Sequence, residues 1–422
     1  MRKNIITPFF VLLLSLSLIA ISSCKGKKSD RELKNIDIAG ALGKGRIIPL
    51  SEIAKDIRYV ALETNDTALV GNINSVFYEN GLIYIVHSST AISVFDDKGK
   101  FIRTIDRSGR GPEEYASLMP IYMLQIDPDN GNLLLLSQDS KLYEYTPTGH
   151  FVRKIQVPVV DSCLNSMSHI LKMKDNTYIA SLSSKDVFYK YCAVVFDTLS
   201  NIKYMVASPK VDYDAITDIM SQTGWVGIEK SSFTKFGEQT RIICSYPNEI
   251  RIIDYNMKID TAYTINYGPY KVTLANRKEM FTPSAKIVNW IGSLLESENF
   301  LFIWLHLRAL AHDPIEKQYT DENGRQNTRL QTNSYALFNK KTGDLTLMNQ
   351  PIKGKQGFKD DIEGGPEFWP KTVSKQEYLV TAHTAVAFME FAENNDCSRT
   401  IKDLAAGLNE NDNPVVALVK LK

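Results

Sequence analysis

The sequence has no excess of charge of either sign, with 49 Lys and Arg residues against 48 Asp and Glu residues. Loss of a predicted signal segment that contains Arg2 and Lys3 leaves a formal charge of −1. A nucleic-acid partner requires a concentrated basic face. We therefore expect no nucleic-acid partner.

Cysteine is scarce, and its spacing is irregular. After Cys24 the chain has no CxxC pair and no Cys/His spacing of the kind that a zinc site uses. Buried free thiols are the preferred interpretation, although an even number of cysteines in an exported protein also permits disulfides. The residues concerned are Cys163, Cys192, Cys244 and Cys397.

The N-terminus has the features of a lipoprotein signal. Arg2 and Lys3 precede the apolar run Phe9–Ile21, which is too short to span a membrane, and small residues precede Cys24. This pattern predicts a signal peptide over 1–23 and a lipidated Cys24 that carries diacylglycerol and an acylated amino terminus, palmitate included. The acyl chains would hold the protein at a membrane surface without crossing it. An ordinary secretory signal that happens to contain a cysteine is the alternative.

A polar segment follows Cys24 and predicts a flexible tether over 24–45. Some Gram-negative lineages mark surface lipoproteins with an acidic run after the lipidated cysteine. Lys25–Asp30 departs from that pattern, so we expect attachment to the outer membrane, with the periplasmic face preferred over the cell surface.

From Arg46 onward, short runs of alternating apolar residues separated by turn signals predict an all-β chain. The most regular unit, Ile92–Ile105, reads as a strand, a tight turn containing Gly99, and a returning strand. This unit recurs four times, first at intervals of about 50 residues and then at a longer one, at Leu142–Val152, Val195–Ile202, Ile252–Ile259 and Leu337–Leu345.

Each copy follows a further strand pair, which gives four strands per unit and predicts a β-propeller. Five units are visible, and Tyr378–Ala382 with Val415–Leu421 supplies most of a sixth. We expect Ile57–Glu63 to close the ring against Val415–Leu421, because closure pairs two exposed edges. The prediction is a six-bladed β-propeller over 46–422, with four antiparallel strands per blade. Two β-sandwich domains are the alternative, which the repeat disfavours.

The last blade is expected to contain a short inserted helix. Ser398–Leu408 combines a helix N-cap with an apolar face, which predicts a helix that packs over the face carrying the long loops.

Four motifs together resemble those of six-bladed β-propeller lipoproteins of Gram-negative bacteria, relatives of the NHL-repeat propellers. The resemblance covers essentially the whole chain after Gly45, and it implies the fold but no settled activity. The motifs lie in Pro49–Glu63, Val94–Ile102, Gly109–Tyr115 and Asp361–Pro370.

Long insertions fall on one predicted face of the propeller, and loops that a rigid scaffold positions often carry function. The densest polar group lies between Arg107 and Tyr115, where two guanidiniums and two carboxylates could bind a carboxylate, a phosphate or a polyol. The alternative is that these residues shape the crossover between blades and pair with their neighbours. The candidates are Arg107, Arg110, Glu113, Glu114 and Tyr115.

A second group of candidates lies nearer the C-terminus. The segment Glu363–Pro370 offers Glu363, Glu367 and Trp369. An exposed Trp369 would suit sugar stacking, although packing is the commoner role of a Trp flanked by Phe and Pro. His306, His312 and His383 could be ligands or acid–base groups, or ordinary polar residues.

No GxSxG, HExxH, P-loop or Asp-box motif is present. The sequence therefore favours a non-catalytic binding or scaffolding module that recognises an envelope protein or a glycan, with no cofactor predicted. The alternative is a metal-dependent hydrolase or lyase of the calcium type, whose ligands would come from several blades.

Overall fold

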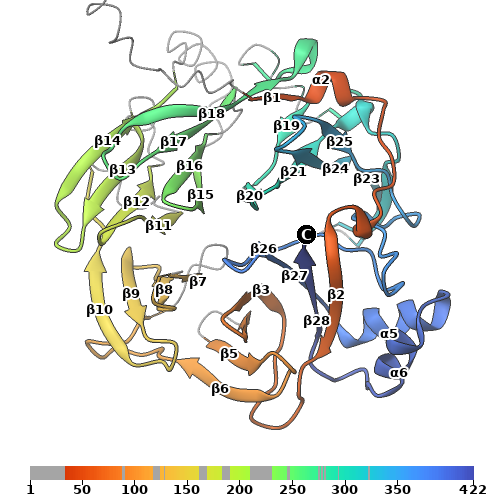
Figure 1. Ribbon diagram of the computed structural model, residues 1–422, viewed down its shortest axis with the longest axis horizontal. Helices are drawn as coiled ribbons and strands as arrows, with labels where there is room; N and C mark the ends of the chain where they lie inside the picture. Colours follow the sequence, from red (N-terminus) through yellow and green to blue (C-terminus); the bar gives the residue numbers. More distant parts are fainter. Residues whose placement is uncertain are drawn as a thin grey trace, which may run out of the picture. The chain divides into compact units, whose positions relative to one another are not determined.

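A computed structural model describes residues 34–422, except 88–90, 117–123, 128, 161–168, 183–190, 210–230, 245–247, 274–275, 277–278, 280–281, 293 and 322–323. Cys24, the signal segment and Cys163 lie outside the described residues. Residues Asn35–Lys422 form one compact unit (Figure 1).

The fold is all-β and propeller-like. The described strands form six sheets of four or five strands, and the first three sheets have four strands each. The first has the order β3-β4-β5-β6 and consists of β3 (Ile73–Glu79), β4 (Leu82–His87), β5 (Ala91–Asp96) and β6 (Phe101–Asp106). The second, β10-β9-β8-β7, consists of β7 (Leu124–Ile126), β8 (Leu133–Leu136), β9 (Lys141–Tyr145) and β10 (Phe151–Gln156). The third consists of β11 (Ile170–Lys172), β12 (Thr177–Ser181), β13 (Tyr191–Asp197) and β14 (Ile202–Ala207).

The fourth and fifth sheets have five strands each, and the sixth combines the two ends of the fold. The fourth has the order β1-β18-β17-β16-β15 and consists of β1 (Lys34–Asp37), β15 (Ser232–Phe236), β16 (Gln239–Ile243), β17 (Glu249–Ile253) and β18 (Ile259–Asn266). The fifth consists of β19 (Asn289–Trp290), β20 (Leu295–Glu296), β21 (Phe300–His306), β24 (Asn333–Asn339) and β25 (Leu345–Leu347). The sixth, β2-β28-β27-β26, consists of β2 (Ala54–Ala61), β26 (Thr372–Val373), β27 (Tyr378–His383) and β28 (Val415–Leu421).

The repeated aspartate of the sequence pattern organises the hairpin turns. Asp96 ends β5, and its Oδ1 accepts hydrogen bonds from the backbone N–H groups of Lys98 and Lys100 at 2.9 Å and 2.8 Å. Asp197 and Asp254 each make the same two bonds in the third and fourth sheets. A side chain that bonds to the backbone two residues ahead stabilises a tight turn, which explains why the pattern recurs.

Consecutive sheets are joined by apolar cores. The first and second sheets share a core that contains Tyr84 and Tyr143, and separate cores join the second to the third, the third to the fourth, the fourth to the fifth and the fifth to the sixth. A further core joins the sixth sheet to the first and contains Ile83, Phe95 and Leu418. Each of the six sheets therefore packs against two others.

The second strand of the fold, β2, lies beside the last strand, β28. β2 pairs antiparallel with β28 over its whole length, with Ile57 opposite Val419 and Ala61 opposite Val415. The sequence predicts this pairing of its two end segments. Its physical basis is the apolar stripe of β28, in which Val415–Val419 are all fully buried.

Residues 34–45 belong to the fold, whereas the sequence assigns them to the tether. β1 lies at the edge of the fourth sheet, and helix α2 (Ile38–Ala41) follows it directly. Ile36 and Ile38 are fully buried in the core shared by the fourth and fifth sheets. The segment is too short and too polar for the sequence alone to predict its strand. The strand depends on pairing with the edge of β18.

Helices are few. The predicted helix at Ser398–Leu408 is α6 (Arg399–Ala406), whose N-cap Ser398 accepts the N–H of Ile401. It packs with α5 (Ala385–Asn394), which the sequence analysis did not predict, against Tyr59. The 3-10 turns are η1 (Leu50–Glu52), η2 (Gly268–Tyr270) and η4 (Arg308–Leu310).

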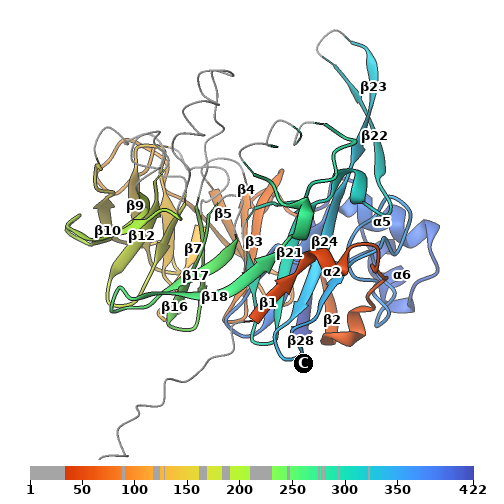
Figure 2. The ribbon, with the colours of Figure 1, turned by 90° about the horizontal axis from the view of Figure 1, so that it is seen from above.

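Strands β22 (Ile315–Thr320) and β23 (Gln326–Gln331) form a separate hairpin that projects from the sheets (Figure 2). It lies within the long insertion between β21 and β24. Its strands pair only with each other among the described residues, and β22 is largely exposed.

Candidate functional site

The loop from Arg107 to Tyr115 is anchored by its last residue. Tyr115 is fully buried, and its ring contacts those of Tyr143 and Tyr145 at centroid distances of 6.0 Å and 6.1 Å. Its hydroxyl accepts the backbone N–H of Arg107 at 3.2 Å. Burial raises the pKa of Tyr115 to about 12, so the hydroxyl stays protonated. Tyr115 is thus a packing residue that fixes the loop.

Two charged side chains of this loop have structural roles, one joining the loop to the turn between β9 and β10 and one bonding within the loop. Arg107 donates from Nε to the carbonyl of Gly149 at 3.1 Å, and Glu114 accepts the N–H of Gly111 at 2.8 Å. Arg110 and Glu113 are exposed. Their roles in ligand binding stay predictions.

The Glu363–Trp369 segment is held against the fifth and sixth sheets. Trp369 stacks on Tyr335, with ring centroids 3.9 Å apart and planes 3° apart, and also contacts Phe358. Glu363 accepts a hydrogen bond from Ser398, the N-cap of α6, at 3.1 Å. Much of the Trp369 ring is therefore in contact with protein, and Glu363 joins this segment to a helix.

Glu367 and His383 approach the same lysine. Glu367 lies 3.8 Å from Lys355, and burial raises the Glu367 pKa. Burial, followed by the charges of Lys355 and Lys371, lowers the pKa of His383 to about 4. Nε2 of His383 is buried without a hydrogen-bond partner among the described residues. His383 is therefore a neutral imidazole at neutral pH.

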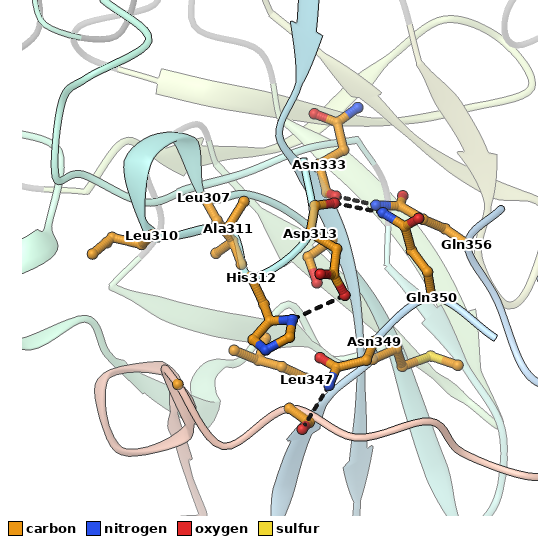
Figure 3. A pocket seen from close by; sticks show the side chains of 14 residues that line it. Leu307, Leu310, Ala311, His312, Asp313, Asn333, Leu347, Asn349, Gln350 and Gln356 are labelled. Atoms are coloured by element: carbon orange, nitrogen blue, oxygen red, sulfur yellow. Dashed lines mark hydrogen bonds and ion pairs between the residues drawn. The ribbon is translucent and has the colours of Figure 1, made fainter. Parts of the chain in front are cut away.

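A pocket lies where the insertion after β21 meets the N-terminal segment (Figure 3). It is a small cavity of about 30 Å³ that widens into space open to solvent. Five separate segments line it, contributing Gly43, Gly45, Leu307, Leu310, Ala311, His312, Asp313, Asn333, Ser334, Leu347, Met348, Asn349, Gln350 and Gln356. Of the histidines noted in the sequence, His312 lines the pocket, and His306 lies on β21 opposite Asn333.

The pocket contains an accessible histidine–carboxylate pair. His312 Nδ1 lies 2.9 Å from Asp313 Oδ2, with side chains 65% and 47% exposed. The two groups lie side by side at the pocket (Figure 3). A carboxylate beside an imidazole offers an acceptor next to a group that can donate or accept.

Amide side chains give the pocket its shape. Asn349 donates to the carbonyl of Gly45 at 2.9 Å, Gln350 donates to that of Asp313 at 2.5 Å, and Gln356 donates to that of Asn333. Each of these bonds ties one segment of the lining to another. The Asn333 side-chain amide makes no bond to the other residues drawn (Figure 3). The lining therefore combines fixed amides, the Asn333 amide and the His312–Asp313 pair with the apolar side chain of Leu310.

Sequence reasoning could not assemble this pocket, because its five segments are far apart in the chain. In the part of the chain that the structure describes, no three His, Cys, Asp or Glu side chains are grouped as a metal site requires. Calcium binding, which the sequence leaves open, stays a prediction. None of the helices described combines the length and apolarity needed to span a bilayer.

The comparisons with known proteins concern family and fold. A family model described as a domain of unknown function (DUF4934) matches residues 33–420. No curated protein matches this sequence. The chain is similar to the crystal structure of a candidate exported protein from Bacteroides fragilis, with a TM-score of 0.65 and 18% sequence identity. The match covers 92% of this chain and 99% of that one. A member of the DUF4221 family from Bacteroides vulgatus is 14% identical, with a TM-score of 0.50, covering 87% and 97%.

These likenesses are below 25% identity, so they show the fold alone. A streptogramin B lyase is 10% identical, with a TM-score of 0.38, covering 87% of this chain and 98% of the lyase. That likeness is too distant to carry an argument about catalysis.

Proposed function

Because the chain belongs to the family described as a domain of unknown function (DUF4934), whose description names no activity, we propose its function from the site itself. The protein is a lipid-anchored, non-catalytic module of the bacterial envelope that binds a glycan in the His312 pocket. Its scaffold is a six-bladed β-propeller whose ring is closed by β2 and β28. The six inter-sheet cores and the β2–β28 pairing support this scaffold.

The lining of the pocket is the observation that carries the ligand class. Sugar hydroxyl groups both donate and accept hydrogen bonds, so they match amide, imidazole and carboxylate groups. The partly exposed side chain of Leu310 can contact the C–H face of a sugar ring, whereas Leu307 is buried beneath it in the core. A highly charged ligand is a poorer match, because His312 and Asp313 are the only side chains among the described lining residues that can carry a charge.

The test uses calorimetry to measure how tightly each member of a panel of neutral oligosaccharides binds to the purified full chain. We expect one class to bind, and His312→Ala and Asp313→Asn to weaken that binding at least tenfold. His150→Ala is the matched control, since His150 is an exposed histidine at the turn between β9 and β10. No binding by the wild-type chain, or equal binding by all variants, contradicts the proposal.

Membrane attachment is the second part of the proposal and rests on the N-terminal sequence. A Cys24→Ala chain should lose its acyl label and leave the membrane fraction, whereas Cys397→Ala should behave as wild type. Wild-type protein without acyl label would refute the anchor. Protease added to intact cells distinguishes the two faces of the membrane, because it cleaves a surface-exposed protein and spares one on the periplasmic face, which we favour.

A protein partner is the second candidate, and the projecting hairpin favours it. Tyr319 and Leu330 are 50% and 45% exposed, and the register places them on opposite faces of β22 and β23. Large exposed apolar side chains are common in binding surfaces. Crosslinked partners that are lost in Tyr319→Ala but kept in His312→Ala would favour this candidate over glycan binding.

A further inference from the structure

Two cysteine side chains meet between the third and fourth sheets. Cys192 belongs to β13, and Cys244 directly follows β16. Both are buried in the core that joins the two sheets. The thiol of Cys244 is hydrogen-bonded to that of Cys192. Contact between sulfurs on separate sheets is the arrangement from which a cross-link can form.

A guanidinium also points at this thiol pair. Arg251, on β17, donates from Nη2 to Cys192 Sγ at 3.2 Å, and its two terminal nitrogens donate to the carbonyl of Ala207 at 3.0 Å and 2.9 Å. Ala207 ends β14, so Arg251 crosses from the fourth sheet to the third. Both cysteines are in the thiol form in this structure. The guanidinium beside Cys192 would stabilise its thiolate form.

The protonation of Cys192 follows from these contacts. The hydrogen bond from Cys244 and the charge of Arg251 lower the pKa of Cys192, against burial, which acts in the opposite direction. Because the thiolate is the nucleophile in thiol–disulfide exchange, Cys192 is the attacking member of the pair.

We propose that Cys192 and Cys244 form a disulfide that joins the third and fourth sheets in the mature protein. The electron acceptor is the disulfide of a thiol–disulfide oxidoreductase in the envelope. The Cys192 thiolate attacks that disulfide and releases one thiolate of the oxidoreductase. The Cys244 thiol then loses its proton and attacks the mixed disulfide, releasing the second thiolate. The pair loses two electrons and two protons, and the oxidoreductase ends as a dithiol.

Bond formation requires the two sulfurs to move closer together. The sulfurs must approach from hydrogen-bond contact to about 2.0 Å, the length of a disulfide bond. Because both thiols are buried in the folded protein, the exchange takes place as the third and fourth sheets come together, when Cys244 and Arg251 already lie beside Cys192. The bridge would close a long loop of the unfolded chain, and such loops give the larger entropic stabilisation in the chain-entropy model.

The first test maps the thiols of the full lipidated chain isolated from its own membranes. Free thiols are blocked with N-ethylmaleimide under denaturing conditions, and the chain is digested without reductant for mass spectrometry. We expect a linked peptide pair containing Cys192 and Cys244. Recovery of both cysteines as N-ethylmaleimide adducts, or a link from either one to Cys163, overturns the proposal.

A second test is independent of where the protein resides. Purified reduced chain is unfolded and refolded with oxidised glutathione, and its Tm is then measured with and without dithiothreitol. We expect dithiothreitol to lower the Tm by several degrees in the wild type and in Cys397→Ala, but to leave it unchanged in Cys192→Ala and Cys244→Ala. Equal sensitivity in all four proteins overturns the proposal. Because no glycan is involved, failure here leaves the pocket proposal standing.

Discussion

The guanidinium of Arg241 donates two hydrogen bonds to the carboxylate of Glu296, at 2.7 Å and 3.1 Å, where both side chains are almost completely buried. Arg241 lies on β16 of the fourth sheet, and Glu296 lies on β20 of the fifth. Lys340 donates to the same carboxylate at 2.9 Å. One buried anion is thus shared by two cations across the junction of two sheets.

Removal of this anion should destabilise the protein strongly. Glu296→Ala leaves Arg241 and Lys340 buried with no carboxylate between them, and an uncompensated buried charge costs about 3–5 kcal/mol. We expect a loss of that size in the free energy of unfolding, measured by urea titration.

The control is Glu238→Ala, because Glu238 is an exposed carboxylate that pairs with Lys174 at 2.8 Å. An exposed pair contributes at most about 1 kcal/mol. Equal losses in the two variants would show that the Glu296 carboxylate has no special role.

The aspartate of the hairpin turn gives a second prediction. Asp96→Ala removes two backbone hydrogen bonds from the turn after β5, and we expect a loss of about 1 kcal/mol, in line with the usual net contribution of one or two such bonds. Asp97→Ala is the neighbouring control, since Asp97 makes only an exposed ion pair with Arg58 at 3.5 Å. A urea titration gives the free energy of unfolding of both variants. A loss in Asp97→Ala as large as that in Asp96→Ala would contradict the role assigned to the turn aspartate.

The third prediction concerns acid sensitivity. Burial lowers the pKa of His169 to about 4, and its Nδ1 accepts the backbone N–H of Phe233 at 2.9 Å. In the unfolded chain a histidine has a pKa near 6.5. Between about pH 6.5 and pH 4 the unfolded state therefore binds a proton that the folded state does not, and stability falls as the pH falls. The full effect of His169 is about 3 kcal/mol.

Urea titrations at pH 7, 5.5 and 4.5 measure this dependence. We expect His169→Gln to flatten the decrease relative to wild type, whatever its stability at pH 7. His150→Gln, at an exposed turn, should keep the wild-type slope. A slope that does not change in His169→Gln would assign the acid sensitivity to other groups.

The strands were the most predictable part of this molecule, because each hairpin carries its own local signal. The alternation of apolar residues around Asp96 and Gly99 predicts β5 and β6, and the structure has both. β1 carries no such signal, since only Ile36 of its four residues is buried and its place depends on the β18 edge. Helix α5 was missed for a similar reason, because the surface that it covers is formed by Tyr59, far away in the chain.

The candidate site was less predictable than the fold. Tyr115 and Trp369 attract attention in the sequence as aromatic residues in polar loops, yet both make extensive contacts with other aromatic rings. The pocket residues Asn333 and Gln356 have no distinctive sequence context. Their proximity follows from hydrogen bonds between loops, which linear spacing does not encode.

The pairing of β2 with β28 also sets an order in time. β2 is synthesised near the start of the chain, but its partner is among the last residues to leave the ribosome. Until then β2 has an unpaired edge, and unpaired edges invite association with other chains. Contacts between distant segments also form slowly. The interval before the last strand arrives is therefore when the protein is most open to aggregation, and a chain that stops before Val415 never leaves that interval.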